Sequence, residues 1–346
     1  MTEIEKHKTR VRAFMKWLFA AAFVFAAIFS GLFSGLTNMA GLFYLVFGSV
    51  AVAFMGFSRR EIGSAFRHAA GFTGPRENLK QAAYFWEAAA RNAWILGVLG
   101  SALNLTIALG GESAGIADIS SRMIQSFVVT LYGLVLSVVC LVPAIKITGR
   151  AEKTQTPENI PAAGIPRSGQ IRLPLFERVT GYVLFAAVLG LTVFSLVRSY
   201  PQKGILPIGK IILHGPAILV VFGGAIALAL FMGAAAGARA LTLGFAMTGL
   251  ISLLMGLIQA LFGFVHKNIN EIAAAMAFII SASSFALLGL VVVAAPLEDR
   301  EMMEGRRERP APLSRMFWIV FPLLVFIFLL LMFIMVITPM NQPGGK

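Results

Sequence analysis

The sequence predicts an all-α polytopic membrane protein of about nine transmembrane helices, arranged as two parallel four-helix repeats followed by a ninth helix. Composition is the first observation: 58% of the 346 residues are hydrophobic and 13% are charged, whereas a soluble domain is roughly 45 to 50% apolar and about 25% charged. The second is that the apolar residues fall into separate runs. The third is a similarity between the two halves of the chain, which occurs in the same order along both.

Nine runs reach, or nearly reach, the roughly 20 residues that a spanning helix needs. Their approximate bounds are 17–35, 40–57, 94–110, 123–145, 179–197, 214–236, 243–264, 272–295 and 316–339. The first run follows a basic tail and has no clear small-residue cleavage site, so we expect an uncleaved first helix rather than a signal peptide.

Lysine and arginine residues gather in alternate segments between these runs: the N-terminal tail, the loops after the second and fourth runs, and the segment after the eighth. The positive-inside rule therefore predicts a cytoplasmic N-terminus and an external C-terminus. The loop at 198–210 does not follow this rule, because Arg198, Lys203 and Lys210 lie on the predicted outer side. The net charge of +13 is then a topology signal rather than a sign of nucleic-acid binding.

These features divide the chain into four parts. Residues 1–150 form a first four-helix unit with a short cytoplasmic insert at 58–92, which reads as two amphipathic helices joined at "GFTGP". Residues 151–175 are a proline-rich linker, and residues 176–300 form a second, more divergent unit. Residues 301–346 hold a charged cytoplasmic segment and the last helix, whose bulky, acid-free sequence predicts a lipid-facing anchor.

The two units match in three places in the same order. "LVFGSVAVAF" in the second run is similar to "VVFGGAIALAL" in the sixth; the third and seventh runs match with Gly97 on Gly249; the fourth and eighth match with Met123 on Met276. Since each unit has four spans, the second begins on the same side of the membrane as the first. A parallel tandem duplication is therefore the better interpretation.

Two runs carry a stripe of small and polar residues at helical spacing. The fourth run has Ser126, Thr130, Gly133 and Ser137, and the third has Gly97, Ser101, Asn104 and Ala108. One interpretation is interhelical packing with hydrogen bonds worth about 0.6 to 2 kcal/mol each; the other is the wall of a polar cavity or ion path. In the eighth run Ser283 and Ser284 are possible equivalents, within a less polar stripe.

The interiors of the nine runs hold no Asp, Glu, Lys, Arg or His. Such groups within the membrane mark proton relays and coupled transporters, so a titrating group for proton transfer is expected to come from another polypeptide. The sequence also shows no nucleophile–base pair, metal-ligand cluster or phosphate loop, which predicts a protein that is not an enzyme and has no metal or cofactor. Cys140 is the single cysteine, so no disulfide forms within the chain.

The stretches that carry these stripes resemble the MotA/TolQ/ExbB proton channel family. "GVLGSALNLTIAL" is similar to the family's Gly-Leu-Leu-Gly-Thr-Val segment of the third helix, and "SFVVTLYGLVLSVVCLVPA" to its Thr-Leu-Tyr-Gly run of the fourth. "VFGSVAVAFMGFS" and "VVFGGAIALALFMG" resemble the end of its second helix. On this pattern Ser101 and Thr130 take the two hydroxyl positions near the ion path, and Leu253 and Ser283 take them in the second unit.

The resemblance implies a subunit of an ion channel or motor complex in the bacterial inner (plasma) membrane, with the proton as the expected ion. Members of the family form a ring around a single-span partner, of the MotB/TolR/ExbD kind, whose intramembrane Asp carries the ion. It therefore implies a homo-oligomer that couples ion flow to mechanical work or transport. The short cytoplasmic region, the duplication and the missing proline at the start of the third helix depart from the pattern. A secondary transporter built from parallel repeats and a structural membrane scaffold remain alternatives.

Overall fold

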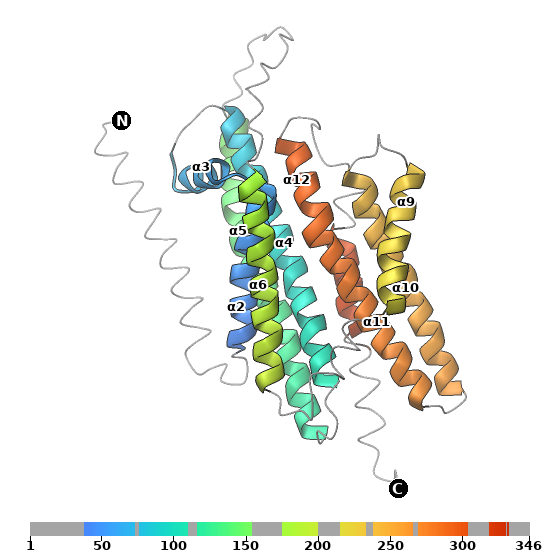
Figure 1. The fold of residues 1–346 in the computed structure, drawn as a ribbon. Helices are drawn as coiled ribbons and strands as arrows, with labels where there is room; N and C mark the ends of the chain where they lie inside the picture. Colours follow the sequence, from blue (N-terminus) through green and yellow to red (C-terminus); the bar gives the residue numbers. More distant parts are fainter. Residues whose placement is uncertain are drawn as a thin grey trace.

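The computed structural model describes residues 38–72, 76–109, 116–153, 175–199, 215–232, 238–265, 269–303, 318–329 and 331. All regular elements in these residues are helices, as predicted (Figure 1). The first predicted span, most of the 151–175 linker and both termini lie outside the described residues, so the predicted sidedness of the termini stays a prediction.

The helices follow one another along the chain without an intervening strand in the described ranges. In order they are α2 (Met39–Gly56), α3 (Arg59–Ala69), α4 (Arg76–Leu109), α5 (Ile116–Lys153), α6 (Leu175–Ser199), α8 (Gly215–Ile218), the π-helical turn η1 (Leu219–Gly223), α9 (Gly224–Met232), α10 (Ala238–Val265), α11 (Ile269–Gly289), the π-helical turn η3 (Leu290–Ala294) and α12 (Ala295–Met303). A further apolar helix, Trp318–Leu329, is called the C-terminal helix below.

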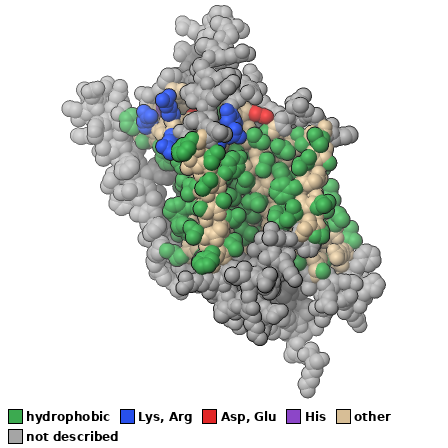
Figure 2. All heavy atoms as spheres, viewed as in Figure 1, with side chains coloured by type: hydrophobic (Ala, Val, Ile, Leu, Met, Phe, Trp, Pro, Cys, Tyr) green, Lys and Arg blue, Asp and Glu red, His purple; other side chains and the backbone are tan. Residues whose placement is uncertain are grey.

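Among the described residues, four helical stretches are long and apolar enough to cross a bilayer: Met39–Gly56, Gln125–Ala151, Ala240–Ala260 and Ala274–Met303. Three shorter apolar helices accompany them, at Arg178–Phe194, Gly215–Ala227 and Trp318–Leu329. With their hydrophobic outer surface (Figure 2), these helices make the chain a multi-pass membrane protein.

Two helical hairpins form the centre of the bundle. In the first, α4 packs along α5, and in the second, α10 packs along α11 (Figure 1). Helix α2 lies against α4, and α9 against α10. The two hairpins meet where α11 contacts α4. Helix α6, the first helix of the predicted second unit, packs along α2 of the first unit.

Small residues allow the backbones in the first hairpin to touch. A methyl group at Gly97 would lie 2.8 Å from Cα of Gly133, and one at Gly133 would lie 2.6 Å from Cα of Gly97. In the second hairpin, a methyl group at Gly249 would lie 2.8 Å from Cβ of Ala286. The sequence match places Gly97 on Gly249, and the match of Met123 to Met276, continued along both helices, places Gly133 on Ala286. Matched positions therefore meet in both hairpins, although the duplication itself stays a prediction.

The first hairpin is longer than a bilayer is thick. Helix α4 has 34 residues and α5 has 38, so at 1.5 Å per residue they reach about 50 to 57 Å, against roughly 30 Å of hydrocarbon. Helix α3 packs on the protruding end, where Phe57, Ala65 and Trp86 belong to a second buried cluster. The predicted insert at 58–92 is thus two helices, of which the second continues without a break into the membrane.

Local sequence explains where α3 begins and ends. Ser58 and Glu61 form a reciprocal capping box at its start, and Gly71 follows its end with φ of +101°, a conformation that residues with a Cβ rarely adopt. Trp86 of α4 then fixes α3 in place by donating its ring N–H to the carbonyl of Ala65 at 3.2 Å.

The eighth apolar run continues as a helix beyond its predicted end at residue 295. Helices α11 and α12 are joined through η3, and the widened turn ends just before Pro296, whose ring cannot be accommodated in a regular α-helix without losing a hydrogen bond. As a result Glu298 and Asp299, which the sequence interpretation placed beyond the span, are buried with 2% and 0% exposure.

The C-terminal helix packs on the bundle along one face, which the expectation of a lipid-facing anchor did not include. Trp318, Phe321 and Val325 are buried and belong to the main hydrophobic core, while Ile319 on the opposite face is exposed. Because its bulky residues lie all round, the sequence contains no polar stripe that would distinguish a packed face from a lipid-facing one.

Candidate ion-path site

The predicted stripes of the third and fourth runs face each other across the first hairpin. The hydroxyls of Ser101 on α4 and Thr130 on α5 lie 2.6 Å apart, and the Ser101 hydroxyl also contacts the backbone carbonyl of Ser126. The Thr130 hydroxyl lies 3.4 Å from the carbonyl of Gly97. All three polar residues are at most 4% exposed, so they form a closed hydrogen-bonded contact directly beside the Gly97–Gly133 crossing.

The other two predicted residues of the first unit lie apart from this contact. The side chain of Asn104 is buried and donates to the carbonyl of Gly100 on its own helix at 3.1 Å. Ser137 lies farther along α5, where it is half-buried and lines a cavity. The structure thus brings Ser101, Ser126 and Thr130 together and leaves Ser137 outside their contact.

A cavity of about 1040 Å³ runs beside α5. Its wall is formed by α4, α5, the start of α12 and the C-terminal helix, and it is predominantly apolar. The polar side chains on it are Tyr84, Glu87, Arg91, Thr130, Ser137, Thr148 and Glu298, with Trp94 and Trp318. Thr130 therefore touches both the closed hydroxyl contact and the cavity, and ionisable groups stand at the α4–α12 part of the same wall.

In the second unit the corresponding positions form no hydroxyl pair. Leu253 on α10, which stands at the Ser101 position, is buried at 1% exposure. The hydroxyls of Ser283 and Ser284 on α11 have no hydrogen-bond partner among the described residues. Within the part of the chain that the structure describes, the hydroxyl pair between hairpin helices thus belongs to the first unit.

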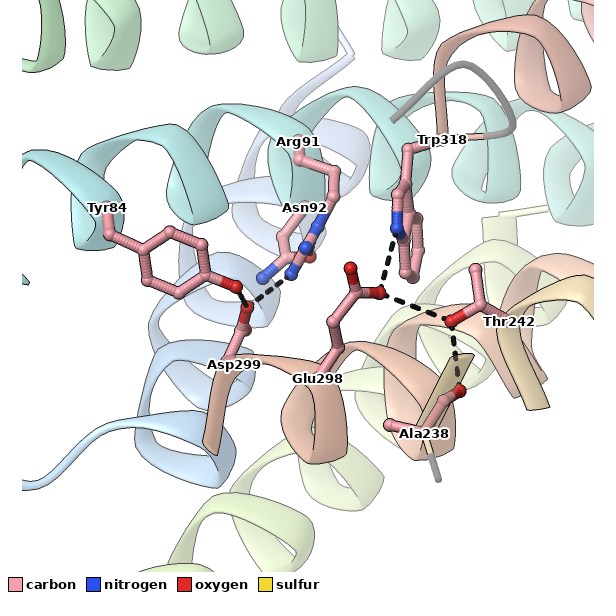
Figure 3. A network of polar contacts seen from close by, with 8 residues as sticks. All are labelled: Tyr84, Arg91, Asn92, Ala238, Thr242, Glu298, Asp299 and Trp318. Carbon is pink, nitrogen blue, oxygen red and sulfur yellow. Dashed lines mark hydrogen bonds and ion pairs between the residues drawn. The ribbon is translucent and has the colours of Figure 1, made fainter. Parts of the chain in front are cut away.

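The charged residues in view gather at one end of the molecule. Figure 2 shows basic and acidic side chains near the α3 end, above a hydrophobic surface. At this end a buried network, the polar junction, joins the two halves of the chain (Figure 3). Its members are Tyr84, Arg91, Thr242, Glu298, Asp299 and Trp318.

Asp299 is the centre of one half of the polar junction. Its Oδ1 accepts hydrogen bonds from Nη2 of Arg91 at 2.7 Å and from the hydroxyl of Tyr84 at 2.9 Å. Burial, followed by the charge of Asp299, raises the pKa of the Tyr84 phenol well above its usual range, so Tyr84 stays a neutral donor. Both donors come from α4, and α12 is thereby tied to the first hairpin.

Glu298 is the centre of the other half. Its Oε2 accepts from the indole N–H of Trp318 at 3.0 Å and from the hydroxyl of Thr242 on α10 at 3.3 Å. The guanidinium of Arg91 lies over the Trp318 ring, 4.4 Å from its centre, a favourable cation–π geometry. Glu298 therefore links α12 to both α10 and the C-terminal helix.

Sequence reasoning did not find the polar junction, because Arg91 and Asp299 lie just outside the apolar runs. One signal was present: a basic residue precedes the third run and two acidic residues follow the eighth, on the same predicted side of the membrane. Separately, no group of His, Cys, Asp and Glu side chains suited to a metal ion occurs among the described residues.

Comparison with known proteins gives one match. Residues 59–157 match the family model of the MotA/TolQ/ExbB proton channel family. No curated protein and no solved structure matches the chain. The matched range begins at α3, includes all of α4 and extends past the end of α5, so it contains the Ser101–Thr130 contact and the Arg91 side of the polar junction. Helices α3 to α5 of this membrane protein are therefore similar to the MotA/TolQ/ExbB proton channel family.

Proposed function

We propose that this chain is a non-enzymatic subunit of an inner-membrane ion channel that conducts protons. It works with a single-span partner protein. The observation that carries the proposal is that the segment matched to the proton channel family is also the hairpin where Ser101 and Thr130 share a buried hydroxyl contact. The resemblance gives those two positions a place near the ion path.

Exposed residues on the cavity side of α5 support the presence of a partner there. Leu131 and Leu134, which line the cavity, are 46% and 48% exposed, and Ile145 is 70% exposed. In lipid, such residues need no cover, but Ser137 is half-buried on the same cavity wall, and hydroxyls within a membrane usually find a polar partner. A partner helix with one Asp in its span would supply one. Ion flow past this acid would then be coupled to mechanical work or transport.

Association with such a partner can be tested on the full chain. We expect affinity purification from native membranes, after mild cross-linking, to recover a single-span protein with one Asp within its span. We also expect several copies of the chain in each particle, which electron microscopy would count. Recovery of the chain alone, as a monomer, would instead favour the permease or scaffold alternatives.

Thr130→Val tests whether the hydroxyl contact serves ion flow. The substitution keeps the shape of the side chain and removes the hydroxyl next to Ser101. A hydroxyl contribution of about 1 kcal/mol to a barrier corresponds to about a fivefold change in rate, so we expect proton flux through the reconstituted complex to fall by about that factor.

The matched control for this substitution is Thr180→Val on α6. The Thr180 hydroxyl bonds only the carbonyl of Phe176 on its own helix among the described residues, in an exposed setting, so flux is expected to stay at the wild-type rate. Equal flux in both variants and the wild type would assign Ser101 and Thr130 to helix packing alone.

A further inference from the structure

Asp299 is a completely buried carboxylate at the place where α12 meets α4 and α2. Its exposure is 0%. Oδ1 is occupied by Arg91 and Tyr84, but Oδ2 has no hydrogen-bond partner among the described residues. Gly56, the last residue of α2, makes room for this carboxylate: a methyl group there would lie 3.2 Å from Oδ2. One oxygen of a buried acid is therefore left without a donor.

The surroundings of Asp299 oppose a permanent negative charge. Neighbouring Glu298 is a second buried acid, and the single positive charge of Arg91 interacts with both carboxylates. Helix α2 contributes no charged side chain; its last carbonyl groups, at Gly56, present the negative end of the helix dipole. Tyr84 on α4 is neutral. On α10, the described polar contact is Thr242, which bonds Glu298.

Later residues of α12 do not change this balance at Oδ2. Glu301 points to the start of α10, where it accepts from the backbone N–H of Ala238 at 2.9 Å. Arg300 is half-buried and follows on the same helix. The direct ionic partner of Asp299 is Arg91, and burying two carboxylates beside one guanidinium is costly unless one of the acids takes up a proton.

A route for that proton is present on the cavity wall. Tyr84 and Arg91, the two donors to Asp299, both line the cavity, as does Glu298. The same cavity is also lined by Thr148, Ser137 and Thr130 on α5. Water in this cavity would thus reach the groups that surround Asp299 and, farther along, the hydroxyls of the proposed ion path.

We propose that Asp299 is a proton-binding site of this chain. A proton from water in the cavity adds to Oδ2, the oxygen without a donor, and the carboxylate becomes a neutral acid. The ion pair to Arg91 then loses its charge complement, and the contact that holds α12 to α4 weakens. Loss of the proton restores the pair. This goes beyond the proposed function, because it needs neither the partner protein nor its acid.

The composition of the chain makes the test unusually direct. Asp118 and Asp299 are its two aspartates, so the full protein, reconstituted in lipid and labelled with ¹³C at the aspartate carboxyl carbon, gives two side-chain signals. Asp118→Asn assigns them by removing one, without touching the polar junction. The titration covers roughly pH 4 to pH 9, the range in which ordinary carboxyls and histidines change charge.

We expect the Asp299 signal to change from the ionised to the protonated form as the pH falls through the titration, at a pH clearly above that of an ordinary carboxyl. Glu298→Gln removes a neighbouring negative charge, so the change should then occur at a lower pH. An Asp299 signal that is ionised above about pH 5, like that of an ordinary carboxyl, would overturn the proposal and leave Asp299 a permanent ion-pair partner. Because the wild-type chain itself is measured, a poorly folding variant cannot obscure the result, and proton flux is not involved.

Discussion

Arg91→Met is expected to lower the stability of the folded protein by about 3 to 5 kcal/mol, the usual cost of removing one partner from a buried ion pair. The reason is Asp299, which stays fully buried and loses the cation that lies 2.7 Å away. The cation–π contact with Trp318 is lost as well. Unfolding by a denaturing detergent at alkaline pH, where Asp299 is ionised and paired in the wild type, would measure the change by circular dichroism.

Two further variants separate this cause from general damage at that end of the molecule. Asp299→Asn added to Arg91→Met removes the unpaired charge and should recover much of the loss. Arg60→Met deletes an exposed cation at the same end and should change stability by less than about 0.5 kcal/mol. The single variant should also regain stability as the pH falls, because protonation neutralises Asp299. A loss that is equal in the single and double variants would contradict the ion-pair explanation.

Gly133→Ala is expected to destabilise the protein by about 3 kcal/mol, at the upper end of what overpacking costs. The new methyl group would lie 2.6 Å from Cα of Gly97 and 2.8 Å from the carbonyl oxygen of Ala93. Both are backbone atoms, so no side chain can rotate away, and α4 and α5 must separate. That separation would also stretch the Ser101–Thr130 contact and lower ion flux.

Gly149→Ala on the same helix is the matched control. Nothing lies within 4 Å of a methyl group at Gly149, and replacing glycine with alanine inside a helix favours the helix by roughly 0.5 to 1 kcal/mol. The two substitutions are chemically identical, so the sign of their effects should differ. Similar stability of both variants would show that α4 and α5 can move apart without cost.

The membrane helices and the α4–α5 contact were predictable because local sequence determines them. The lengths of the apolar runs predicted α2, α5, α10 and α11, and the spacing of small residues placed Ser101 and Thr130 on facing stripes. Periodicity reveals which face of a helix is small and polar, and in lipid such a face is where a neighbouring helix fits. What the contact does could not be read in the same way, since packing and an ion path demand similar residues.

The polar junction was not predictable, for two physical reasons. First, hydropathy reports where apolar side chains end, not where a helix ends, and α12 continues for a further two turns beyond Pro296. Second, the partners Arg91 and Asp299 are far apart in the chain, so their pairing depends on how α11 packs against α4. The buried face of the C-terminal helix was missed for the second reason also.

The packing of α6 along α2 bears on how the protein is made. Gly181 of α6 comes so close to α2 that a methyl group there would lie 2.8 Å from the backbone nitrogen of Met55, and Phe185 of α6 is buried in the same interface. During synthesis α2 leaves the ribosome long before α6, with the linker in between. The face of α2 that α6 covers is therefore completed only after α2, α3, α4 and α5 have been synthesised.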